Sequence, residues 1–148
     1  MKYSILSLAL LATSVQADVT SVVGPVNQYV NNTIEYVSDS SDYWQTGEET
    51  LSREAGDCED FAILKLEMLA DLGVSATLAY GYTDSGIAHM ITIVDGFVLD
   101  NNTDAVLTLA ESSFNMVFEI DVANKTAIVN NKSVPFTKHK LFTDYINR

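Results

Sequence analysis

The stretch GDCEDFAILKLEMLADLG, residues 56–73, combines a largely apolar helical pattern with the only cysteine of the chain. Apolar side chains recur at helical spacing over residues 58–72, and Gly73 ends the pattern. Asp57 stands directly before the first turn, where it can act as the N-cap. We therefore predict a mostly buried helix with Cys58 in its first turn, where the helix dipole favours a thiolate.

Two helices are predicted before this stretch and five strands after it. The helices cover residues 25–37, with Pro25 suited to the first helical position, and residues 48–53. The strands cover residues 76–82, 87–94, 97–100, 116–122 and 127–129. Helices followed by antiparallel strands predict an α+β fold, in which N-terminal helices pack on an antiparallel β-meander.

The first seventeen residues, MKYSILSLALLATSVQA, have the features of a secretory signal peptide. Lys2 precedes an apolar run that is too short for a permanent membrane helix, and the segment ends in small residues up to Ala17. We therefore expect cleavage after Ala17, export of the protein, and one domain over residues 18–148.

Charge and cysteine content narrow the function classes. The formal net charge is −12 at pH 7, and an acidic surface repels the phosphate backbone, so we exclude nucleic acid as a partner. A single cysteine also excludes an intrachain disulfide. An unpaired thiol in an exported protein is either incidental or kept for its reactivity.

A predicted hairpin brings a histidine to a carboxylate. Asp95-Gly96 lies between two apolar runs, which is the pattern of a two-residue hairpin turn. This turn sets His89 opposite Asn102 and makes Asp100 its diagonal neighbour on the same sheet face. With Cys58 at a buried helix start packed on that sheet, a Cys-His-Asp triad becomes geometrically reasonable.

Each member of this triad would have its own task. Cys58 would attack a carbonyl carbon as thiolate, His89 would transfer protons, and Asp100 would hold the imidazole tautomer. The backbone N–H of Cys58 is a natural oxyanion donor, and Gln45 or the Trp44 indole are candidates for a second donor. The alternatives are a structural cysteine, a strand histidine with satisfied hydrogen bonds, and an aspartate that only starts a turn.

Three carboxylates surround the cysteine: Asp57, Glu59 and Asp60. They stabilise a helix start through capping and the dipole, which alone would explain them. However, they also oppose a thiolate at Cys58. A bound divalent cation would remove this conflict, and because carboxylate oxygens select hard ions, we expect calcium rather than zinc.

Several short motifs carry a family resemblance. They are YWQTGEETL at residues 43–51, AGDCEDFA at 55–62, LGV at 72–74, AHM at 88–90 and VLDN at 98–101. In this order they resemble the bacterial transglutaminase-like cysteine proteinases, and among them the LapG-type periplasmic proteases. One departure is Gly47, which stands where the family pattern has proline.

The resemblance implies a papain-like or transglutaminase-like fold with Cys58, His89 and Asp100 as the catalytic triad. It also implies that calcium is bound by the acidic residues beside the cysteine, which here are Asp57, Glu59 and Asp60.

The implied function is that of a periplasmic, calcium-dependent cysteine endopeptidase. Such enzymes cleave a large repeat adhesin to control biofilm attachment, and an inner-membrane receptor of the cyclic-di-GMP pathway holds them in check. Two other hypotheses keep the same fold: a transglutaminase-like acyl transferase that uses the same triad, and a catalytically idle binding module. The complete Cys-His-Asp set argues against the idle module.

Overall fold

The computed structural model describes residues 18–137 and 139–148, so the predicted signal peptide lies outside the described residues. The helices are α1 (Val19–Thr33), α2 (Gly47–Arg53), α3 (Cys58–Asp71) and α4 (Lys140–Ile146). The strands are β1 (Glu35–Tyr36), β2 (Ala55–Gly56), β3 (Thr77–Tyr82), β4 (Ala88–Val94), β5 (Phe97–Asp100), β6 (Thr103–Thr108), β7 (Asn115–Asp121), β8 (Thr126–Val129) and β9 (Lys132–Pro135). Among the described helices, none combines the length and apolarity needed to cross a membrane.

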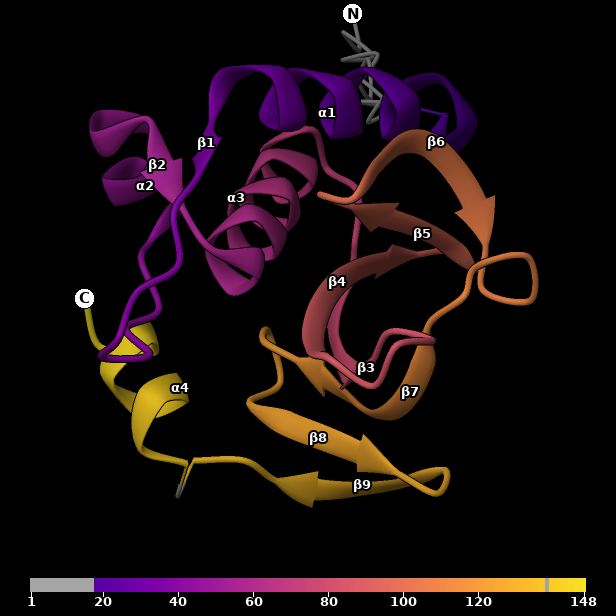
Figure 1. Ribbon diagram of the computed structural model, residues 1–148. Helices are drawn as coiled ribbons and strands as arrows, with labels where there is room; N and C mark the ends of the chain where they lie inside the picture. Colours follow the sequence, from indigo (N-terminus) through magenta and orange to yellow (C-terminus); the bar gives the residue numbers. More distant parts are fainter. Residues whose placement is uncertain (1–17, 138) are drawn as a thin grey trace, which may run out of the picture.

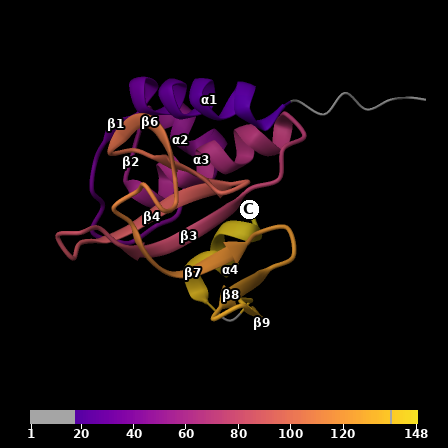
Figure 2. The ribbon, with the colours of Figure 1, turned by 90° about the vertical axis from the view of Figure 1, so that its right-hand side faces the viewer.

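Helix α3 is the centre of the fold, and the mostly buried helix predicted over residues 58–72 is confirmed. It lies between α1 on one side and the sheet on the other (Figure 2). Phe61 and Leu64 pack against α1, whereas Ile63 and Leu66 pack against the sheet. The Oγ1 of Thr92 on β4 donates a 2.7 Å hydrogen bond to the carbonyl of Ala62, which fixes the helix on the sheet.

The large sheet has seven antiparallel strands in the order β6-β5-β4-β3-β7-β8-β9 (Figure 1). The four strands β3 to β6 follow one another as a meander, and β7 then returns to the free side of β3. Val94 pairs with Phe97 across the Asp95-Gly96 turn, as predicted. The α+β architecture, with Cys58 at a helix start packed on an antiparallel sheet, is therefore confirmed.

Helix α1 differs from its prediction at both ends. It begins at Val19 because Asp18 caps it through the N–H of Thr20, so Pro25 lies inside the helix and not at its first position. It ends at Thr33, before the predicted residue 37. The backbone beyond it turns to a short parallel pairing, in which the N–H of Glu35 donates to the carbonyl of Glu54.

Helix α4 was not predicted, and it closes the end of the core opposite α1 (Figure 1). Phe142 and Tyr145 of this helix are buried among the side chains of α3 and β7. The Tyr145 hydroxyl donates a 2.9 Å hydrogen bond to Glu67 Oε1. The C-terminal segment therefore belongs to the same core as the central helix.

Candidate active site

Cys58 is the first residue of α3, and Asp57 is its N-cap residue. The Cys58 thiol donates a hydrogen bond to Glu59 Oε2 at 3.0 Å. Burial and the Glu59 carboxylate raise the pKa of the Cys58 thiol well above its ordinary value, and the backbone N–H of Met90 only partly offsets them. The thiol in this arrangement is therefore protonated at neutral pH.

His89 and Asp100 form a close pair at the open end of the β4–β5 hairpin. The Nε2 of His89 lies 2.8 Å from Asp100 Oδ1, and the His89 side chain is only 6% exposed. The backbone N–H of Asn102 donates to the same Asp100 oxygen at 2.9 Å. Burial raises the pKa of Asp100, but the hydrogen bonds from His89 and Asn102 outweigh it and hold that pKa below its ordinary value. Since Nε2 is engaged, Nδ1 is the His89 nitrogen left to exchange a proton.

Cys58 and His89 line one cleft of about 640 Å³. One part of its lining is aromatic and includes Trp44, Tyr80, Phe118 and Phe136. Another part is acidic and includes Asp39, Asp42, Asp57 and Glu59. The thiol and the imidazole therefore share a solvent-accessible space, although the hydrogen bond of the thiol goes to Glu59 and not to His89.

Asp60 faces away from this cleft and has a structural task. Its Oδ1 accepts a 2.7 Å hydrogen bond from the Gln45 backbone, and its Oδ2 accepts from the Gln45 side chain at 2.6 Å and from the Asp57 backbone at 3.1 Å. A side chain at Gly56 would collide with it, because a Cβ there would lie 2.7 Å from Asp60 Oδ2. Asp60 thus anchors the segment that carries Trp44, and the Gln45 amide is committed to it rather than free as an oxyanion donor.

Asp57 and Glu59 have the chemistry of a cation site. Asp57 Oδ1 is buried without a hydrogen-bond partner among the described residues. Burial and the neighbouring Glu59 raise the pKa of Asp57 to about 7, and burial also raises that of Glu59. Two neighbouring buried carboxylates of this kind fit a hard divalent cation such as calcium. Within residues 18–137 and 139–148, however, no three such side chains already converge as a metal site.

Asp39 and Asp42 belong to the acidic part of the cleft lining, together with Asp57 and Glu59, but were not predicted as site residues. The polar run over residues 38–42 interrupts the helical pattern of the sequence and predicts no ligand by itself. A hydrogen bond with Asp42 raises the pKa of Glu59. The charge of Asp39 raises the pKa of Asp57, whereas the Asp39 backbone lowers it. The available signal was a pair of aspartates in a polar run, 19 and 16 residues before the predicted nucleophile.

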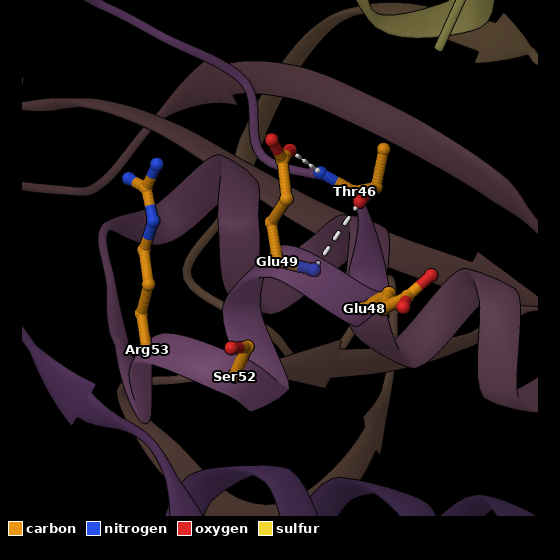
Figure 3. Close-up of a pocket in the computed structure, with 5 residues that line it drawn as sticks. All are labelled: Thr46, Glu48, Glu49, Ser52 and Arg53. Atoms are coloured by element: carbon orange, nitrogen blue, oxygen red, sulfur yellow. Dashed lines mark hydrogen bonds between the residues drawn. The ribbon is translucent and has the colours of Figure 1, made fainter.

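The departure at Gly47 has a structural reason. Gly47 begins α2 after the capping box formed by Thr46 and Glu49, which is drawn in Figure 3. Its backbone N–H donates a 2.9 Å hydrogen bond to Glu67 Oε2 on α3, and proline has no N–H to donate. The hollow of about 230 Å³ beside α2 in Figure 3 shares no lining residue with the cleft of Cys58.

The comparisons with known proteins agree with this geometry. The family model described as bacterial transglutaminase-like cysteine proteinase matches residues 7–133. No curated protein sequence matches the chain. Among solved structures, EGTA-treated LapG of Legionella pneumophila is 20% identical with a TM-score of 0.80, covering 90% of this chain and 80% of its own. Calcium-bound LapG of the same organism is 21% identical with a TM-score of 0.74, covering 87% and 81%. At these identities the two structures establish similarity of fold.

Proposed function

The chain belongs to the bacterial transglutaminase-like cysteine proteinase family, and on this basis we propose that it is a calcium-dependent cysteine endopeptidase of the periplasm. The proposed catalytic residues are Cys58, His89 and Asp100. The observation that carries this assignment is the 2.8 Å contact between His89 and Asp100 at the cleft that Cys58 also lines.

The proposed reaction follows from the position of each group. His89 removes the thiol proton through Nδ1, and the Cys58 sulfur attacks the carbonyl carbon of the scissile peptide. The Cys58 backbone N–H, at the first position of α3, has no partner within the helix and can donate to the developing oxyanion. His89 then protonates the leaving amine, and water hydrolyses the thioester. Asp100 accepts from Nε2–H throughout, which fixes the tautomer and stabilises the imidazolium.

We assign the proposed calcium site to Asp57 and Glu59. Bound calcium would supply positive charge beside the thiol, where these carboxylates now oppose ionisation. Support comes from the unpartnered Asp57 Oδ1 and from the raised pKa values of both groups. Asp60, predicted as a third ligand, already accepts three hydrogen bonds, so we expect it to support the site without contacting the ion.

The substrate, partner and location are proposed from the family resemblance and the leader sequence. We propose a large repeat adhesin as substrate, an inner-membrane cyclic-di-GMP receptor as regulator, and the periplasm as compartment.

Cleavage of a purified N-terminal fragment of a repeat adhesin from the same organism tests this function. Cys58→Ala should abolish cleavage, and Asp100→Asn should lower it about 1,000- to 10,000-fold if the triad behaves as in serine proteases. Asp95→Asn is a matched control on the same hairpin, at a turn position with φ 50°, which asparagine tolerates well. Cleavage by a correctly folded Cys58→Ala variant would refute the proposal.

A further inference from the structure

Arg148 follows α4 in the chain and reaches the segment that precedes α2. Its Nη1 donates one hydrogen bond to the carbonyl of Trp44 at 3.0 Å and another to Glu49 Oε2 at 3.1 Å. The guanidinium also lies over the Tyr43 ring, with Cζ 4.0 Å from the ring centroid. The planar, charged group of one side chain therefore contacts three residues between positions 43 and 49.

Glu49 joins the residues that Arg148 contacts into one network. Its Oε1 accepts a 2.8 Å hydrogen bond from the Tyr43 hydroxyl. Its Oε2 accepts from the backbone N–H of Thr46 at 2.8 Å, within the capping box of Figure 3, as well as from Arg148. The Arg148 and Glu49 side chains are 27% and 32% exposed, so the ion pair is partly shielded from solvent. It belongs to a network of hydrogen bonds, which distinguishes it from an isolated surface pair.

Trp44 connects this network to the cleft. It lines the cleft together with Cys58, and it is 5% exposed. The rings of His139 and Phe142 pack against the indole, with centroid separations of 5.8 Å and 6.5 Å. Arg148 holds the backbone carbonyl of the same residue. The C-terminal segment therefore fixes Trp44 through both its ring and its backbone.

The residue after Trp44 has an anchor of its own. The backbone and the side-chain amide of Gln45 donate to the two oxygens of Asp60 at 2.7 Å and 2.6 Å. These hydrogen bonds hold the segment to the first turn of α3, which begins at Cys58. Trp44 thus lies between two anchors, one made by Asp60 and one made by Arg148. Loss of the Arg148 contacts should release Trp44 while the first turn of α3 keeps its own hydrogen bonds.

We propose that Arg148 is a positioning residue, which holds Trp44 in the lining of the cleft so that this surface is already ordered when a polypeptide substrate binds. An ordered binding surface avoids the entropy cost of fixing side chains during binding. This inference rests on the proposed function, because it takes Trp44 to contact the substrate of an endopeptidase that uses Cys58. Arg148 lies beyond residue 133, where the family match ends, so membership of the family does not imply this role.

The first test is acrylamide quenching of tryptophan fluorescence, which reports on this position alone because Trp44 is the only tryptophan of the chain. In Arg148→Met, acrylamide should quench Trp44 about two-fold more strongly than in the wild type, because the residue becomes more mobile and more exposed. Arg148→Lys keeps the charge but lacks the planar group, so its quenching should be intermediate. Lys140→Met is the matched control on α4, because Lys140 pairs with Asp144 of the same helix, and it should quench like the wild type. Circular dichroism at the same temperature checks that each variant is folded.

The second test is the kinetics of cleavage of the adhesin fragment. Arg148→Met should raise KM about 3- to 10-fold and leave kcat within about two-fold, because the substrate-binding surface is loosened while the catalytic residues keep their contacts. Equal quenching in Arg148→Met and the wild type would refute the positioning of Trp44 by Arg148. Stronger quenching with an unchanged KM would refute its role in substrate binding. A wild type that cleaves no fragment would refute the proposed function, whereas the quenching comparison would still decide whether Arg148 holds Trp44.

Discussion

Glu59→Gln should make Cys58 more reactive when calcium is absent. Glutamine keeps the shape of Glu59 and an oxygen that can accept from the thiol, but it removes the negative charge. The charged oxygen lies 3.0 Å from the Cys58 sulfur. At an effective dielectric constant of about 20, a unit charge at this separation opposes the thiolate by ~5 kcal/mol. Solvent in the open cleft reduces this to about 1.4–3 kcal/mol, which corresponds to about 10- to 100-fold in thiolate population.

The assay is alkylation of Cys58 at about pH 8, where ordinary glutamates are ionised, with and without a calcium chelator. In chelator, Glu59→Gln should react about 10- to 100-fold faster than the wild type. Calcium should accelerate the wild type and have much less effect on the variant, which lacks one proposed ligand. Glu48→Gln makes the same chemical change on the exposed surface of α2 and serves as the control. Equal rates for the wild type and Glu59→Gln in chelator, with unchanged circular dichroism, would refute the electrostatic reasoning.

Three further predictions concern stability. Burial raises the pKa of Asp57 to about 7 and that of Asp60 to about 6, so the folded state binds more protons than the unfolded state above about pH 4. Without calcium, the melting temperature should therefore fall as the pH rises from about 4 to about 7, and calcium should restore it at the upper end; calorimetry showing a flat profile in chelator would contradict this. Gly47→Pro should lower the free energy of unfolding by about 1–3 kcal/mol in urea titrations, because the hydrogen bond to Glu67 is lost, and unchanged stability would count against that bond. Phe142→Ala should cost about 3–5 kcal/mol, because this 0% exposed ring anchors α4; a loss below about 1 kcal/mol would mean that α4 is not part of the core.

The hairpin of β4 and β5 shows why part of the fold could be predicted. A two-residue Asp-Gly turn fixes which residues face each other, so one dipeptide set the pairing of Val94 with Phe97. The strands of the large sheet that were missed, β6 and β9, lie at its two edges, and the short pair β1 and β2 was missed as well. All four residues of β9 are exposed, so it has no alternation of apolar and polar side chains to detect. Helix α4 has seven residues, too few for a clear helical period, and tertiary packing of Phe142 stabilises it.

In the candidate site, the sequence predicted that Cys58 and His89 lie close together, but it did not predict the different contacts of the three carboxylates. Successive residues of a helix start point in directions about 100° apart, so adjacent carboxylates meet different surroundings. Asp57 and Glu59 line the cleft, whereas Asp60 binds Gln45 on the far side. The sequence contains no sign of this difference.

Acidification cannot replace a cation at this site. The carboxylates that line the cleft could be neutralised in two ways, by protons or by a bound metal ion. Asp57 takes up its proton near pH 7, whereas the pKa of Cys58 lies well above its ordinary value. Any pH low enough to neutralise Asp57 therefore also keeps the thiol protonated. A metal ion differs, since it neutralises carboxylates while leaving the thiol proton free to move to His89. Proteolysis in chelator should consequently stay low from about pH 5 to about pH 9. A peak of full activity at acid pH without calcium would show that protonated carboxylates suffice.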